Sequence, residues 1–166
     1  MYKGYLKVAA AVPQVRVADC HYNTDQVEQI MARAEGQGVE IVCFPELNIT
    51  GYSCQDLFQQ QLLLDEAEAA LLRLLEFSRN LNIVAIVGVP VVHGGSLYNC
   101  AAVLQHGKIH GLVPKTYIPN YKEFYEERWF TSGAALTGGV KFRFCGQNIP
   151  FGTNLLFEVD EVKFGI

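Results

Sequence analysis

Two short apolar segments, residues 39–44 and 83–89, restrict the fold of this chain more than any other feature. Both are rich in β-branched side chains, and only Glu40 interrupts them with a charge. Strands of this composition are typical of sheets that are covered on both faces. Between the two segments, apolar residues recur at helical spacing from Ala67 to Leu81. This alternation of strand and helix predicts an α/β fold.

The segments on either side extend the pattern. Residues 6–12 indicate a buried first strand, and a helix with apolar residues at helical spacing should follow it. Gly36 and Gly38 are expected to end that helix. The predicted helix starts are an N-cap at Asn23 for the first helix and a capping box of Asp65 and Glu68 for the second.

The second half of the chain predicts antiparallel strands. Residues 97–104 and 108–113 flank a short connection in which Gly107 can adopt the positive φ of a tight hairpin. After an aromatic and charged stretch, short strands are expected at residues 140–144, 155–159 and 162–166. The last strand stops without a cap or a turn, so we expect a chain that is interrupted inside its core.

Composition limits the possible functions. The 166 residues can bury one core, and without a repeat or a linker residues 1–166 are expected to form one domain. The net charge of −4 provides no basic stripe for nucleic acid. The apolar run at residues 8–12 is too short for a membrane span or a secretory signal, which predicts a cytoplasmic protein without a membrane partner.

The cysteines and histidines predict neither disulfides nor a metal site. Five cysteines are an odd number, none forms a Cys-x-x-Cys pair, and no histidine lies near them at ligand spacing. None is at a strand-to-helix turn next to a base, where a nucleophilic thiol is expected. We therefore interpret all five as reduced structural residues: Cys20, Cys43, Cys54, Cys100 and Cys145.

Glu46 and Lys115 each follow a proline at the end of an apolar run. The ends of buried strands are where α/β enzymes keep reactive groups. A carboxylate there can act as a general base, and an ammonium can stabilise an oxyanion. The pattern is equally consistent with two surface charges that end their strands.

The stretch from residue 117 to residue 130 is dense in aromatic side chains, which indicates a loop that wraps a pocket or an interface. Glu123 and Glu126, with Glu127 beside them, could line that pocket. The same carboxylates could instead form the solvated face of a helical turn.

Several segments resemble one enzyme family. Residues 44–52 (FPELNITGY) resemble the glutamate motif of the nitrilase superfamily of carbon-nitrogen hydrolases, and residues 114–121 (PKTYIPNY) resemble its lysine motif. Residues 50–58, 122–130 and 149–157 are similar to the glutaminase domains of glutamine-dependent NAD synthetases, one branch of that superfamily. The motifs occur in order along essentially the whole chain, which is far more specific than any one of them.

The resemblance implies a nitrilase-like α-β-β-α sandwich, in which two mixed sheets have flanking helices, here incomplete. It implies that Glu46 is the general base and that Lys115 stabilises the oxyanion. By the same likeness, the glutamine pocket contains Tyr52, Tyr121, Phe124 and Glu126, with Glu126 as a second glutamate near the catalytic residues.

In this family the strand that matches residues 162–166 leads into the turn with the nucleophilic cysteine, which would lie beyond Ile166. The chain as given is therefore expected to lack glutaminase activity. In the implied parent protein the thiolate attacks the glutamine carboxamide, ammonia leaves, and water activated by Glu46 hydrolyses the thioester.

The resemblance also implies partners. Ammonia would pass to a C-terminal synthetase domain of the same polypeptide, which uses ATP and magnesium to join it to adenylated nicotinic acid adenine dinucleotide. This region itself needs no cofactor, and a homo-oligomer is expected. Two alternatives remain: a free-standing nitrilase-type amidase that acts on another amide or nitrile, and a non-catalytic scaffold if the native chain ends at Ile166.

Overall fold

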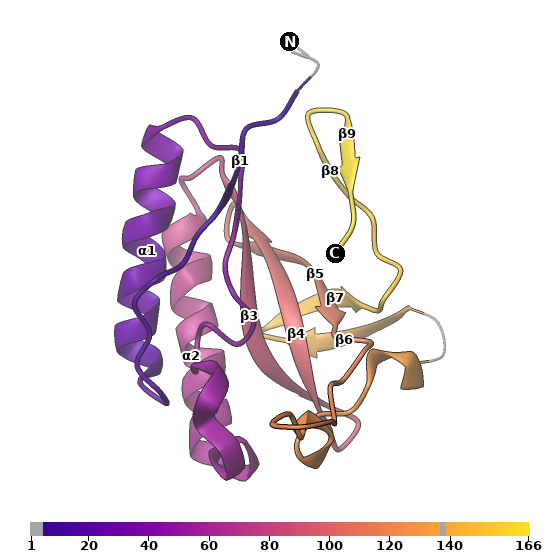
Figure 1. Cartoon of the computed structure of the whole chain (residues 1–166). Coiled ribbons are helices and arrows are strands. Elements are labelled where there is room, and N and C mark those ends of the chain that lie inside the picture. The colour runs from indigo at the N-terminus through magenta and orange to yellow at the C-terminus, as the bar shows by residue number, and fades with distance from the viewer. Residues whose placement is uncertain (1–4, 137–138) are drawn as a thin grey trace.

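The structure is a computed structural model that describes residues 5–136 and 139–166 (Figure 1). The first half contains β1 (Val8–Ala10), α1 (Cys20–Gly36), β2 (Ile41–Cys43), the 3₁₀ segment η1 (Tyr52–Gln59), α2 (Gln61–Ser78) and β3 (Val84–His93). The second half contains β4 (Ser96–Gln105), β5 (Lys108–Pro114), the 3₁₀ turns η2 (Glu126–Arg128) and η3 (Gly133–Ala135), β6 (Val140–Phe144), β7 (Gln147–Phe151), β8 (Phe157–Val159) and β9 (Val162–Phe164).

Seven strands form one mixed sheet in the order β1-β2-β3-β4-β5-β7-β6. The β1–β2, β2–β3 and β5–β7 pairs are parallel, whereas the β3–β4, β4–β5 and β6–β7 pairs are antiparallel. Helices α1 and α2 lie side by side on one face, while the β8–β9 hairpin lies on the other side of the sheet (Figure 1). The predicted α/β fold is confirmed.

The apolar residues form a cluster on each face of the sheet. The larger cluster joins α1 and α2 to the sheet through residues such as Met31, Leu71 and Val87. The smaller one joins Ile86 and Val113 of the sheet to Phe157 of the hairpin. The near-continuous apolar sequence of β3 follows from this, since both of its faces are buried.

Helix α1 begins earlier than predicted. Its N-cap is Asp19, whose carboxylate accepts a hydrogen bond from the backbone N–H of Tyr22 at 3.0 Å. The predicted cap at Asn23 is wrong, because this side chain is buried and donates to the carbonyl oxygens of Arg16 at 2.8 Å and Ile49 at 3.0 Å. Asn23 thus ties the helix to two loops.

Helix α2 also begins earlier than predicted, at Gln61, so the capping box at Asp65 and Glu68 is wrong. Asp65 lies one turn inside the helix and accepts a hydrogen bond from the Gln61 side chain at 2.8 Å. Glu68 accepts one from the backbone N–H of Cys145 at 3.2 Å. Neither carboxylate caps the helix: Asp65 contacts a residue of the same helix, and Glu68 contacts a distant segment.

The predicted hairpin of β4 and β5 is confirmed, with Gly107 at φ +73° in its turn. Strand β3 extends to His93, beyond the predicted end at residue 89, and β1 has only three residues of the predicted 6–12. Strand β7 was not predicted. It pairs in parallel with β5 and antiparallel with β6, although Pro150 lies within it.

Candidate active site

Glu46 lies in the turn that leaves β2, and Gly88 of β3 fixes where this turn runs. The backbone of residues 45–47 packs directly on Gly88, so closely that a Cβ atom there would lie 2.2 Å from the backbone nitrogen of Leu47. The N–H of Gly88 donates to the Asn48 side chain at 2.7 Å, and its carbonyl accepts from Ile49 at 3.2 Å. The exit of β2 is thereby anchored to the neighbouring strand.

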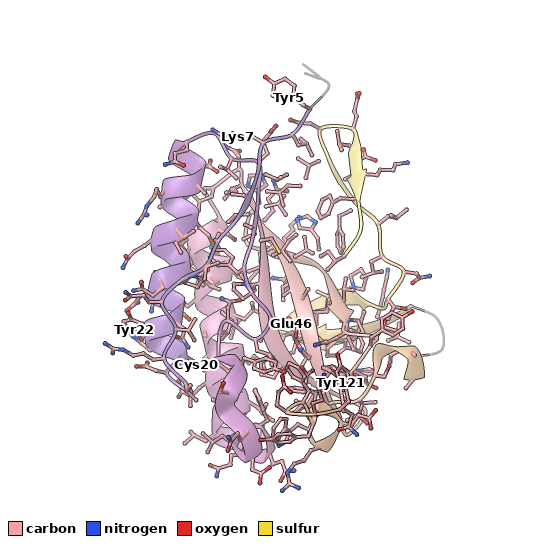
Figure 2. All side chains as sticks on the ribbon, in the orientation of Figure 1. Tyr5, Lys7, Cys20, Tyr22, Glu46 and Tyr121 are labelled. Carbon is pink, nitrogen blue, oxygen red and sulfur yellow. The ribbon has the colours of Figure 1, made fainter. Side chains whose placement is uncertain are left out.

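Lys115 follows the last residue of β5, and both its backbone N–H and its backbone carbonyl are hydrogen-bonded. Its N–H donates to the carbonyl of Asn99 on β4 at 2.8 Å, and its carbonyl accepts from Gly133 at 2.8 Å. Its ammonium Nζ lies 2.8 Å from Oε2 of Glu46. The two charges that end apolar runs in the sequence therefore meet, next to Gly88 in the middle of β3. Figure 2 labels Glu46, beside the strands, and Tyr121, on the loop that follows Lys115.

Glu126 provides a second carboxylate to the same ammonium. It begins η2 and is only 3% exposed. Both of its oxygens lie 3.2 Å from Nζ of Lys115, and Oε1 also accepts a hydrogen bond from the Tyr52 hydroxyl at 2.5 Å. Lys115, Glu46, Glu126 and Tyr52, all predicted site residues, thus form one hydrogen-bonded cluster.

The charges in this cluster determine the protonation of Lys115 and Tyr52. Burial lowers the pKa of Lys115, but hydrogen bonds and charge from Glu46 and Glu126 outweigh it, so the net shift is upward. Burial, followed by the hydrogen bond and charge of Glu126, raises the pKa of Tyr52. At neutral pH Lys115 is therefore a cation and Tyr52 a neutral donor.

An ion pair between Asp56 and Arg128 joins the two segments that carry Tyr52 and Glu126. The Asp56 carboxylate of η1 accepts hydrogen bonds from Arg128 Nε at 2.6 Å and from Trp129 Nε1 at 2.9 Å. Arg128 Nη2 lies 2.9 Å from its second oxygen. This bidentate pair holds η1 and η2 together next to the Tyr52–Glu126 contact.

Tyr121 and Phe124 lie on the loop before η2 and contact each other, with ring centroids 6.0 Å apart. Tyr121 is 64% exposed. Glu123 and Glu127 are exposed, and Glu127 accepts a hydrogen bond from Asn120 at 2.8 Å. Of the three carboxylates proposed for a pocket, the structure brings only Glu126 to the hydrogen-bonded cluster with Lys115.

Beside the cluster lies a cavity of about 500 Å³. Its polar lining includes Glu46, Lys115 and Asn99, and apolar side chains of β2 to β5 supply much of the rest. Tyr117 and Ile166 also line it, whereas Tyr121 and Phe124 lie outside its lining. The arrangement places a base and a cation at the edge of an apolar cavity.

Within the described residues, the cysteine thiols take no part in the hydrogen bonds of this cluster. Cys20, Cys54, Cys100 and Cys145 are buried, and burial is the main cause that raises the pKa of each. Cys43 is exposed and lines the cavity, but burial raises the pKa of its thiol as well. Within residues 5–136 and 139–166, no thiol is hydrogen-bonded to Glu46 or Lys115.

Two structural properties concern other kinds of site. No group of three or more His, Cys, Asp or Glu side chains in the described part of the chain is placed to hold a metal ion. None of the helices in the described ranges is both long enough and apolar enough to span a membrane.

Sequence reasoning missed Gly88 and Asn99. Gly88 is one small residue in an apolar strand and does not stand out from its neighbours. Both residues matter because they contact the turn that carries Glu46: its backbone packs on Gly88, and its Glu46 side chain accepts a hydrogen bond from Asn99. A polar residue inside a buried strand was the signal that could have identified Asn99.

Comparisons with known proteins identify the family. The carbon-nitrogen hydrolase family matches residues 7–163. Glutamine-dependent NAD(+) synthetase of Mycobacterium tuberculosis is 37% identical over 159 residues, which are 96% of this chain and 23% of the relative. The corresponding protein of Xanthomonas campestris is 38% identical over 126 residues, which are 75% of this chain and 22% of the relative.

Solved structures agree. A glutamine-dependent NAD(+) synthetase from Cytophaga hutchinsonii superposes with a TM-score of 0.85 at 29% identity, over 96% of this chain and 27% of that one. An amidase of the nitrilase superfamily from Nesterenkonia shares the fold, with a TM-score of 0.69 at 21% identity over 87% of this chain and 54% of that one. The chain spans less than a quarter of the length of these curated relatives. With the Glu46–Lys115 pair in place and the family matched along nearly its whole length, this chain belongs to the carbon-nitrogen hydrolase family.

Proposed function

We propose that this chain is the glutaminase part of a glutamine-dependent NAD synthetase and takes part in hydrolysing the carboxamide of glutamine. The observation that carries the proposal is the Lys115 ammonium, held between Glu46 and Glu126 beside a cavity of about 500 Å³. The 37% identity to synthetases of that name over 96% of the chain supports the choice of glutamine.

In the proposed reaction a cysteine thiol gives its proton to Glu46, and the thiolate attacks the carboxamide carbon. Lys115 faces the oxyanion that develops, a role supported by its raised pKa. Glu46 returns the proton to the departing ammonia. It then takes a proton from water, which attacks the thioester to release glutamate and the thiol.

Glu126 and Tyr52 keep Lys115 in place. The buried carboxylate of Glu126 needs a cation or hydrogen-bond donors, and it has both in Lys115 and Tyr52. Tyr121 and Phe124 are proposed to contact the glutamine substrate from the loop before η2.

The nucleophilic thiol is proposed to follow Ile166. The support is positional: Ile166 lines the same cavity as Glu46 and Lys115. Among the described residues, no cysteine is hydrogen-bonded to Glu46 or Lys115, which agrees with this.

The wider assembly is part of the same proposal. Ammonia would pass to a C-terminal synthetase domain that uses ATP and magnesium, in a cytoplasmic homo-oligomer. The proposal assigns ATP and magnesium to that other domain, and neither takes part in the steps above.

The test is ammonia release from glutamine by the full-length protein, compared with a panel of other amides and nitriles. Glutamine turnover that is lost in Glu46→Gln supports the proposal. Turnover of other amides with glutamine inert would identify a general amidase. Absence of any turnover would favour the non-catalytic scaffold.

A further inference from the structure

Asn99 of β4 contacts both members of the catalytic pair. Its side-chain Nδ2 donates to Oε2 of Glu46 at 3.0 Å, and its backbone carbonyl accepts the N–H of Lys115 at 2.8 Å. The residue is only 3% exposed and lies within the sheet, opposite Pro90 of β3. A buried amide side chain must find partners, and this one is directed at a catalytic carboxylate.

The hydrogen bonds make the two oxygens of Glu46 different. Oε2 accepts from Lys115 Nζ at 2.8 Å and from Asn99 Nδ2 at 3.0 Å. Among residues 5–136 and 139–166, no side chain or backbone group donates to Oε1. The Glu46 side chain is 52% exposed and lines the cavity, so Oε1 keeps its lone pairs for a proton from a ligand or water.

Lys115 alone would not fix this difference. An ammonium is a compact charge with three equivalent N–H donors, and this one is shared with Glu126. The amide of Asn99 is planar and buried, and its backbone is held in the β3–β4 ladder. It therefore supplies the directional contact that sets the rotation of the Glu46 carboxylate.

We propose that Asn99 is a positioning residue that holds Oε2 of Glu46 and thereby leaves Oε1 as the atom that accepts the proton. This inference rests on the proposed amide hydrolysis and adds to it the atom of Glu46 that acts as base.

The first test is the kinetics of three variants of the full-length protein. Asn99→Leu removes the donor and keeps the branching of the side chain at Cγ, and Asn99→Asp replaces the donor with an acid of the same shape. Asn148→Leu, at an exposed position of β7, is the control. We expect Asn99→Leu to lower kcat about 10- to 100-fold, the usual effect of losing a hydrogen bond to a charged group, while KM stays within about twofold.

The pH dependence separates positioning from a role in packing. The groups that face residue 99 are Glu46, Lys115 and Glu126, with Tyr52 behind Glu126. Two neighbouring carboxylates share a proton as the pH falls, and the acid introduced by Asn99→Asp can then donate to Oε2. The ratio of kcat for Asn99→Asp to kcat for Asn99→Leu should rise toward acidic pH. A ratio that is constant with pH, or an equal loss in Asn148→Leu, would overturn the inference.

A spectroscopic test does not depend on glutamine as substrate. The side-chain ¹H–¹⁵N signals of Asn99 should shift in Glu46→Met, which removes the acceptor, while those of Asn148 should not. Unchanged Asn99 signals would overturn the inference whatever the substrate is. If glutamine is inert but another amide is hydrolysed, the kinetic comparison is made with that amide, and only the proposed substrate fails.

Discussion

Nζ of Lys115 lies 2.8 Å from Oε2 of Glu46, although the two residues are 69 positions apart in the chain. They follow β5 and β2, which are separated in the sheet by β3 and β4. The turn after β2 spans this gap by crossing Gly88 of β3 and reaching Asn99 of β4. The Glu46–Lys115 ion pair therefore depends on the two strands that lie between its members.

Lys115→Met should reduce kcat for amide hydrolysis about 100- to 1,000-fold, the range found when a donor to an oxyanion is removed. Lys115→Arg should not restore the rate, because a planar guanidinium cannot occupy the position of an ammonium between two carboxylates. Steady-state kinetics of the full-length protein would measure both effects. A Lys115→Met enzyme of normal kcat would show that Lys115 has only a structural role.

Gly88→Ala should destabilise the protein by about 1–3 kcal/mol, the usual cost of forcing extra volume into a packed site. The added Cβ would lie 2.2 Å from the Leu47 nitrogen, so the Glu46 turn must move and kcat should fall as well. Urea unfolding measures the first effect and amide turnover the second.

The matched control is Gly36→Ala at the end of α1. No atom lies within 4 Å of a Cβ built there. Stability should be unchanged or increase by up to about 1 kcal/mol, since alanine favours the helix. Equal stability of the Gly88→Ala and Gly36→Ala proteins would contradict the close packing of the Glu46 turn.

The parts of this structure that local sequence determines could be predicted. The spacing of apolar residues and the glycine of the turn identified the β4–β5 hairpin. The ends of apolar runs identified Glu46 and Lys115, which the structure brings together. Family membership was predicted from the motifs around these residues and is confirmed.

The remainder depends on contacts between distant segments. Asp19 and Asn23 are both residue types that cap helices well. Asp19 caps α1, because the side chain of Asn23 is hydrogen-bonded to the carbonyl of Ile49 instead. Strand β7 contains Pro150 and two polar residues, and it becomes a strand through parallel pairing with β5. Which residue faces Glu46 across the sheet depends on strand register, which no local pattern specifies.

The free energy of unfolding should fall as the pH rises above about 8.5, the value for an unfolded cysteine. Burial raises the pKa of Cys20 and Cys145 to about 12, so the folded state keeps protons that the unfolded state releases. Their contribution is complete below about pH 8.5 and is lost as the pH rises toward about 12.

Urea unfolding at a series of alkaline pH values would measure this decline, which should reach about 1 kcal/mol per pH unit for each thiol. Cys145→Ala should make it shallower, whereas Cys43→Ala, at an exposed site, should change it less. If the free energy of unfolding declined with the same slope in the wild type, Cys145→Ala and Cys43→Ala, groups other than these thiols would cause the decline.

Tyr52→Phe should lower the free energy of unfolding by about 1 kcal/mol, because it removes a hydrogen bond to the buried carboxylate of Glu126 from a residue that is itself 41% exposed. The effect on kcat should be smaller than that of Lys115→Met, since Lys115 keeps both carboxylate partners. Tyr125→Phe, which keeps the ring contact with Trp129, is the control and should affect neither quantity.

The pH dependence of the Tyr52→Phe effect has a definite sign. The pKa of Tyr52 is raised by burial and by Glu126, so the stability that its hydroxyl contributes is complete below about pH 10, where unfolded tyrosine ionises. Above that pH the wild type should lose stability that the variant never had, and the two free energies of unfolding should converge. Urea unfolding of both proteins around that pH measures this, and a difference that grows with pH would mean that the hydroxyl is not a donor to Glu126.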